Sequence, residues 1–134
     1  MEENRALVLI VVRPGPLRDG VEALMATVPR TEIVGKVESA SSALRLVFRC
    51  HPDLLLLDAS LPGGESWNVL THCRKEHPGL RCIVFANDAE QVRKGRIAGA
   101  DAVFLHGYPA EEIVGTVERL LFSDVEKPGS TQSS

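Results

Sequence analysis

The sequence has few cysteines and no long hydrophobic run. These two absences argue against a disulfide-rich protein and against a membrane-spanning one. Its three cysteines, Cys50, Cys73 and Cys82, are odd in number and form no CxxC pair. This argues against a disulfide framework and favours a reduced, cytoplasmic protein. The longest unbroken apolar run, 6–12, is too short to span a bilayer. An acidic start, MEENR, precedes that run, which is the wrong charge order for a secretory signal.

A strong charge of either sign is also missing. The formal net charge is −3, and acidic and basic residues are scattered along the chain. Without a basic stripe or a polybasic arm, we expect no direct binding to nucleic acid or to a membrane. No His or Cys pair has the spacing of metal ligands, so we expect no metal site of that kind. Hydrophobic residues make up 44% of the chain, which is enough for a folded core.

Strand-like and helix-like segments alternate along the chain. Apolar runs typical of strands occupy 5–12, 31–37, 54–57, 81–86 and 102–105. A segment with helical spacing of apolar residues follows each of them, beginning near 16, 39, 65, 88 and 109. Five βα repeats predict an α/β fold, with helices on both faces of a parallel sheet. We expect a single domain over 1–122 and a flexible tail or linker over 123–134, where the sequence is SDVEKPGSTQSS.

Local signals refine these helices. Ser39 suits the N-cap of the second helix, and Asn87 or Asp88 suits that of the fourth. Pro109 suits the first turn of the last helix. Apolar residues at helical spacing are usually core, so we expect Trp67 and the phenylalanines to be buried, and the second helix to present the stripe Ala43, Leu44, Val47 and Phe48.

The stretch LLLLDASLPGG, 54–64, carries the most informative signal. Its four leucines predict a strand buried on both faces, and Asp58 follows them directly. Two interpretations of this acid remain open. It is either a functional carboxylate at the end of a strand, or a structural residue that accepts hydrogen bonds from loop N–H groups.

Together with IVFA at 83–86, AGADAVFLH at 98–106 and the order of elements, this stretch resembles the CheY-like receiver domains of two-component response regulators. The resemblance covers 5–122, and PLRDGVEAL at 16–24 is similar to the first helix of regulators with a helix-turn-helix output domain. It implies a flavodoxin-like (βα)5 three-layer sandwich with strand order 2-1-3-4-5. The site would lie at the carboxyl ends of the strands.

The resemblance also implies a chemistry, phosphoryl transfer from a phosphohistidine onto an aspartate that binds Mg²⁺ together with an acidic pair. Asp58 matches the phosphoacceptor, but the other positions do not match. The acidic pair falls on Val12 and Arg13, the Thr or Ser on Ala86, the Lys on His106 and the switch aromatic on Val103, with Phe104 beside it.

These departures predict a degenerate receiver, or pseudo-receiver, with weak or absent Mg²⁺ binding. Mg²⁺ prefers carboxylate oxygens, and Arg13 places a permanent cation where the metal would bind. We expect the Arg13 guanidinium to pair with Asp58, unless Arg13 is simply a solvated loop residue. His106 is also expected near Asp58, where its charge would follow pH.

The favoured function is a signalling module, not an enzyme, that acts through protein contacts. Its partner would be a histidine kinase or an output domain, and a homodimer would use the fourth helix, the fifth strand and the fifth helix, as the family does. The alternative is a working receiver, phosphorylated on Asp58 and controlling a transcription output domain. A flavin carrier is disfavoured, because VRPGPLRDG at 12–20 lacks the Ser and Thr expected of a phosphate-binding loop.

Overall fold

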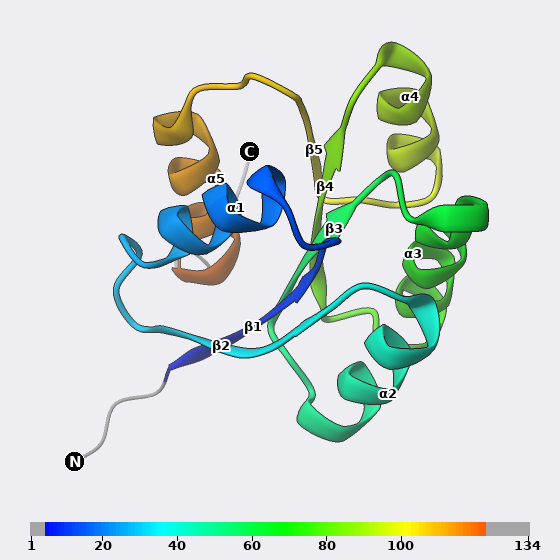
Figure 1. Ribbon diagram of the computed structural model, residues 1–134. Coiled ribbons are helices and arrows are strands. Elements are labelled where there is room, and N and C mark those ends of the chain that lie inside the picture. Colours follow the sequence, from blue (N-terminus) through cyan, green and yellow to red (C-terminus); the bar gives the residue numbers. More distant parts are fainter. Residues whose placement is uncertain (1–4, 123–134) are drawn as a thin grey trace, which may run out of the picture.

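The computed structural model describes residues 5–122 and has a parallel sheet between two layers of helices (Figure 1). The strands run in the spatial order β2-β1-β3-β4-β5. This order confirms the predicted flavodoxin-like fold. The predicted tail, 123–134, lies outside the described residues. The strands are β1 (Ala6–Val11), β2 (Thr31–Val37), β3 (Leu54–Asp58), β4 (Arg81–Ala86) and β5 (Ala102–Leu105).

The helices divide between the two faces of the sheet. Figure 1 shows α1 (Pro16–Met25) and α5 (Ala110–Phe122) together on one face. The other face carries α2 (Ala40–Cys50), α3 (Glu65–Glu76) and α4 (Ala89–Ile97), and a 3-10 turn, η1 (Pro62–Gly64), leads into α3. Within 5–122, no helix combines the length and the apolar character needed to cross a membrane.

The central strands are buried on both faces, which explains their uninterrupted apolar sequence. Every residue of β3, from Leu54 to Asp58, is buried. Alternate side chains of the neighbouring strand point to opposite faces of the sheet, so Leu9 and Val11 pack toward α2 and α3, whereas Val8 and Ile10 pack toward α1 and α5. Asp58 is therefore the last residue of a fully buried strand at the centre of the sheet.

Side-chain caps fix where two of the helices begin. Ser39 Oγ accepts a hydrogen bond from the Ser42 backbone N–H at 3.2 Å, which confirms the predicted cap of α2. For α4 the cap is Asp88 rather than Asn87, because Asp88 Oδ1 accepts from the Gln91 N–H at 2.9 Å. The chain therefore leaves β4 through Asn87 with its side chain available to other partners.

The expectation that all phenylalanines are core is wrong at Phe48, whose side chain is 70% exposed. Helical geometry explains the difference. Ala43 and Val47 are buried against the sheet, and Phe48 is rotated by about 100° from Val47, beyond the face that the core covers. Phe85 and Phe104 are buried as expected, and Trp67 packs against the core while partly exposed.

The cysteines give a first prediction, that two of the three thiols are protected in the folded chain. Burial raises the pKa of Cys73 to about 11 and that of Cys82 to about 12, whereas Cys50 is only partly buried. Since the thiolate is the reactive form, an aromatic disulfide reagent at pH 8 should label one thiol per folded chain and three per unfolded chain. Cys50→Ser should abolish the fast labelling; labelling of a second thiol at the same rate would contradict the prediction.

The same burial predicts how stability depends on alkaline pH. In the unfolded chain these thiols ionise near their ordinary pKa of 9.0, and in the folded chain only near 11 and 12. Above pH 9 the unfolded chain loses protons first, so the free energy of unfolding should fall as the pH rises. In the double variant Cys73→Ala/Cys82→Ala, the free energy of unfolding measured with urea should fall less between pH 9 and 10.5 than it does in the natural chain.

Candidate functional site

A cleft of about 570 Å³ lies at the carboxyl ends of the strands. Because all five strands are parallel, the loops that follow them meet at this edge of the sheet. The end of every strand contributes to the lining of the cleft, with Arg13 to Leu17 after β1, Glu38 after β2, Asp58 at the end of β3, Asn87 after β4 and His106 after β5. The fold thus brings together three residues that the sequence singled out, and it adds Glu38 and Asn87.

Asp58 is held by both of its carboxylate oxygens and is only 4% exposed. Its Oδ1 accepts a hydrogen bond of 2.8 Å from the Ser60 backbone N–H, two residues along the chain. Its Oδ2 faces Arg13, whose Nε lies 3.5 Å away. Both contacts expected of this carboxylate, a hydrogen bond from a loop N–H and an ion pair with Arg13, are therefore present.

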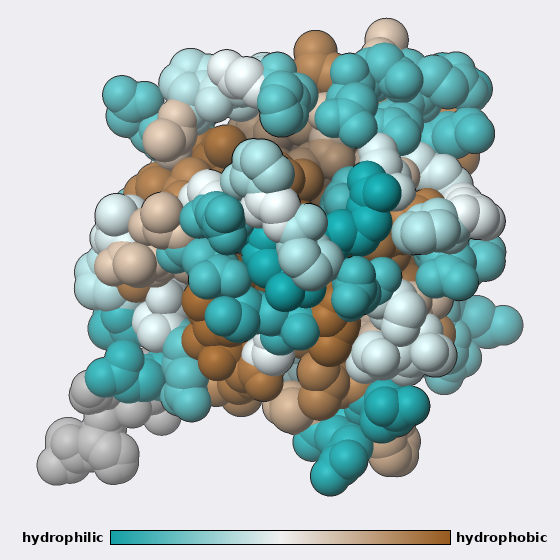
Figure 2. Space-filling view, viewed as in Figure 1, coloured by the Kyte–Doolittle hydropathy of each residue, from teal (hydrophilic) through white to brown (hydrophobic). Residues whose placement is uncertain are grey.

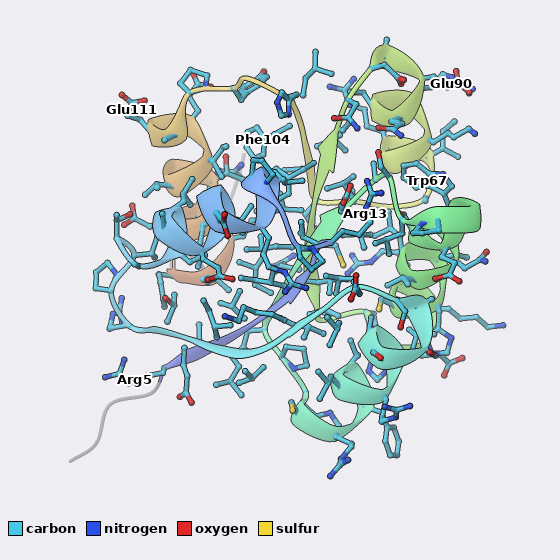
Figure 3. All side chains as sticks on the ribbon, viewed as in Figure 1. Arg5, Arg13, Trp67, Glu90, Phe104 and Glu111 are labelled. Carbon is cyan, nitrogen blue, oxygen red and sulfur yellow. The ribbon has the colours of Figure 1, made fainter. Side chains whose placement is uncertain are left out.

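Arg13 reaches the carboxylate with one nitrogen and keeps the rest of its guanidinium in solvent. Figure 3 shows its side chain extending over the end of β3, and the side chain is 49% exposed. The pair is therefore not the bidentate fork that gives the strongest arginine–carboxylate contacts. Among the residues that the structure describes, the two terminal nitrogens of Arg13 have no hydrogen-bond partner.

The residues present do not fit the Mg²⁺ site that the resemblance implies. Val12 is fully buried and packs in the core beneath α1 and α5, so its side chain offers the metal no ligand. Arg13 places its positive charge next to the Asp58 carboxylate, where it repels a second cation. Glu38 lines the cleft but is exposed, and among the described residues no hydrogen bond or ion pair joins it to Arg13 or Asp58. Within 5–122, no three His, Cys, Asp or Glu side chains cluster closely enough to bind a metal ion.

The positions after β4 and within β5 also differ from the family pattern. Ala86 is buried at the end of β4 and has no hydroxyl to donate. The His106 backbone N–H donates to the Ala86 carbonyl at 2.8 Å, and His106 lines the same cleft as Asp58. Val103 packs against the core beside α4, where Gly95 leaves room for it. Phe104, the neighbouring aromatic, is buried in the core beneath α1 and α5.

A hydrogen-bond network that sequence reasoning missed joins the loop after β3 to the start of α4. Ser60 Oγ accepts from Asn87 Nδ2 at 2.8 Å and from Gln91 Nε2 at 3.2 Å. Gln91 Oε1 in turn accepts from the Asn87 backbone N–H at 2.8 Å. These contacts couple the segment next to Asp58 to α4 without any group at Ala86. The sequence signals only the Asx turn, in which the Asp58 side chain accepts from the N–H two residues on, and not the contacts of Ser60 Oγ with α4.

Comparison with known proteins found relatives of one kind, although no family model matches the chain. It is 29% identical over 114 residues to the nitrate/nitrite response regulator NarL of Escherichia coli K12, covering 84% of this chain and 53% of NarL. It is 31% identical over 102 residues to the transcriptional regulatory protein YhcZ of Bacillus subtilis, covering 75% of this chain and 48% of YhcZ. The chain thus spans about half the length of these relatives.

Solved structures agree on the fold. A DNA-binding response regulator of the LuxR family from Staphylococcus aureus superposes with a TM-score of 0.76 at 23% identity, covering 86% of this chain and 98% of that one. The response regulatory domain of mrkE from Klebsiella pneumoniae gives 0.78 at 17% identity, covering 87% and 96%. At these identities the likeness concerns the fold alone. The likeness to regulatory proteins rests on the sequence relatives above.

Proposed function

We propose that this chain, a CheY-like receiver domain of the response-regulator type, signals through protein contacts without Mg²⁺-dependent phosphorylation of Asp58. The observation that carries the proposal is the position of Arg13, with Nε 3.5 Å from Asp58 Oδ2. In this interpretation a cation that belongs to the chain takes the place of the metal. The domain is then a pseudo-receiver, with a carboxylate already neutralised in the resting state.

The chemistry of phosphoryl transfer supports this proposal. The reaction depends on positioning and on neutralising the charge of the transferring group. Here Ala86 cannot donate a hydrogen bond, and His106 stands where a permanent cation would be needed. Loss of one such electrostatic stabiliser typically lowers a rate by about 100- to 1000-fold. Several losses together should make phosphorylation too slow to serve as a signal.

Intact mass spectrometry after incubation with acetyl phosphate tests the proposal directly. The chain is expected to gain no phosphate adduct with Mg²⁺ present, just as the Asp58→Ala control treated in the same way gains none. A Mg²⁺-dependent adduct that disappears in Asp58→Ala would overturn the proposal. A response regulator known to accept phosphate from acetyl phosphate should be labelled in parallel, to show that the donor is active.

That overturning result would favour the alternative, a working receiver that takes phosphate from a histidine kinase and controls an output domain. One feature favours it. The terminal nitrogens of Arg13, unpaired among the described residues, lie beside Asp58 and are available to bind phosphoryl oxygens. The same mass experiment with purified histidine kinase and ATP separates the two functions.

The contact surface of the proposed module is the face formed by α4, β5 and α5. Ile97 is 72% exposed there, and Leu105 and Tyr108 are exposed beside it around a groove between α4 and β5. Exposed apolar groups gathered in this way are typical of protein contact sites. The occupant would be an output domain, a kinase or a second copy of this chain.

If the face forms a homodimer, Ile97→Glu should weaken it by at least about tenfold, because the substitution would bury a charge in the contact. Sedimentation equilibrium of the natural chain and of Ile97→Glu measures the change in the dimer dissociation constant. Phe48→Glu is the matched control, since Phe48 is equally exposed but lies on α2. Equal effects of the two substitutions would place the contact elsewhere.

A further inference from the structure

We propose that the pocket between the start of α1 and the loop after β5 binds a small, uncharged, flat aromatic molecule, and that this ligand is an input to the domain. The pocket has a volume of about 340 Å³ and adjoins the Asp58 cleft, with which it shares Pro16, Leu17 and His106. Its role as an input rests on the proposed function, because a domain that phosphate does not control needs another signal. Its existence as a binding site does not depend on that function.

The lining defines the chemistry of the ligand. Apolar side chains from α1, the ends of β4 and β5, and α5 surround the pocket, among them Leu17, Leu24, Phe85 and Ile113. Figure 2 shows apolar surface at this place, between the polar groups around the β5–α5 loop and those at the start of α1. Ligand pockets in proteins are typically of this kind, mostly apolar with a few polar groups that orient the ligand.

Aromatic rings form one wall of the pocket. Phe104, which Figure 3 places between the β5–α5 loop and the start of α1, stacks on Phe85 with ring centroids 6.5 Å apart. Tyr108 meets Phe104 edge to face at 5.1 Å. A flat ring in the pocket would extend this series, which is favourable because offset and edge-to-face ring pairs attract. A cavity of about 150 Å³ accommodates benzene, so this pocket has room for roughly two rings.

Charge favours an uncharged ligand with one hydrogen-bonding group. Among the described residues, the only polar side chains lining the pocket are His106 and Tyr108, neither of which carries a permanent charge. The adjoining Asp58 cleft holds two carboxylates, Asp58 and Glu38, against one guanidinium, so an acidic ligand gains little there. A ligand N–H or O–H pairs instead with the His106 imidazole or the Tyr108 hydroxyl.

Shared residues connect the pocket to both functional surfaces. His106 lines this pocket and the Asp58 cleft. Leu105 and Tyr108 line this pocket and the groove between α4 and β5. A ligand that moves the Tyr108 ring therefore changes the contact face directly, without a phosphoryl group on Asp58.

Indole is a suitable probe, since it has two fused rings, no charge and one N–H donor. Titrated into the ¹⁵N-labelled chain, it should give saturable shifts of the backbone amides of Gly20, Gly107 and Tyr108. Gly20→Leu should abolish these shifts. Gly20 lines the pocket, and a Cβ added to it would meet no described atom within 4 Å, so a leucine there fills the pocket rather than the core. Gly115→Leu is the matched control, since Gly115 is helical and equally unobstructed but lies away from the pocket.

Different outcomes test whether the pocket binds the ligand and whether the bound ligand acts as an input to the domain. Absent shifts, or shifts that persist in Gly20→Leu, overturn the binding site. Shifts that stop at the pocket and leave the α4 amides near Ile97 unchanged overturn the role as an input. Indole-3-acetate, which carries a carboxylate, should bind at least tenfold more weakly than indole; tighter binding would overturn the uncharged ligand class. None of these measurements uses a phosphodonor, so they are independent of the mass experiment on Asp58.

Discussion

Replacing Arg13 by aspartate is expected to create a Mg²⁺-dependent stabilisation that the natural chain lacks. Arg13→Asp removes the guanidinium 3.5 Å from Asp58 and places a second carboxylate in the cleft. Mg²⁺ is commonly held by one or two carboxylates and several waters, so this pair suffices for binding. At a Mg²⁺ concentration about ten times the dissociation constant, the folded state gains about 1.4 kcal/mol. The melting temperature should then rise by roughly 5 °C.

Thermal unfolding followed by circular dichroism, with and without MgCl₂ at about 10 mM, measures the effect of the metal. Arg13→Ala is the matched control, because it removes the cation without adding a ligand, and it should respond much less. NaCl at equal ionic strength separates binding of the metal from general screening of charge. An unchanged melting temperature in Arg13→Asp, or an equal rise in the natural chain, would show that Arg13 does not stand in the place of the metal.

Gly99→Ala is expected to be the most destabilising of the glycine substitutions in the chain's turns. Gly99 has a φ of +102°, a region that costs other residues about 1–3 kcal/mol. An added Cβ would also lie 2.6 Å from Arg74 Cγ. Arg74 cannot move freely, since it donates to the Leu80 carbonyl and pairs with Asp101 Oδ2 at 3.7 Å. We expect a total loss of about 2–4 kcal/mol in the free energy of unfolding.

Urea unfolding measures this loss, and Gly115→Ala provides the contrast. Gly115 lies inside α5, and an added Cβ there would meet no described atom within 4 Å, so alanine should stabilise the chain by about 0.5–1 kcal/mol. The two substitutions add the same methyl group and should have opposite signs. A loss below about 0.5 kcal/mol for Gly99→Ala would mean that the turn and Arg74 adjust at little cost.

Periodicity and local signals predicted the α/β class with helices on both faces of a parallel sheet, whereas the strand order was expected from the resemblance to receiver domains. Continuous apolar strands such as LLLL at 54–57 have one stable location, the centre of a sheet covered on both faces. The cap at Ser39 was equally clear, because its hydroxyl satisfies an N–H only three residues away. Phe48 shows the limit of this reasoning. Its spacing belongs to the stripe of α2, but the width of the face that the core covers depends on packing, which no local pattern records.

The part of the site that could be expected from the sequence is the pair of residues placed at the ends of two strands. Asp58 ends β3 and Arg13 follows β1, and these two strands are neighbours in the strand order that the resemblance implies, so the two residues were expected at the same edge of the sheet. Glu38, Asn87 and the hydrogen bonds to Ser60 were not predicted. Their places depend on how each loop turns after its strand, and many loop conformations are compatible with the same sequence.

The tether of Arg13 has a consequence for how the domain responds to its surroundings. A metal ion binds in proportion to its free concentration, whereas a guanidinium on the chain has a fixed effective concentration at the carboxylate. Neither dilution nor a chelator can remove it. The electrostatic state around Asp58 is therefore constant across conditions in which an ordinary ion site would empty and refill. Under the proposed function, the guanidinium stays beside this carboxylate whatever the metal concentration, and variation in the output of the domain would arise from its abundance and from what binds elsewhere on its surface.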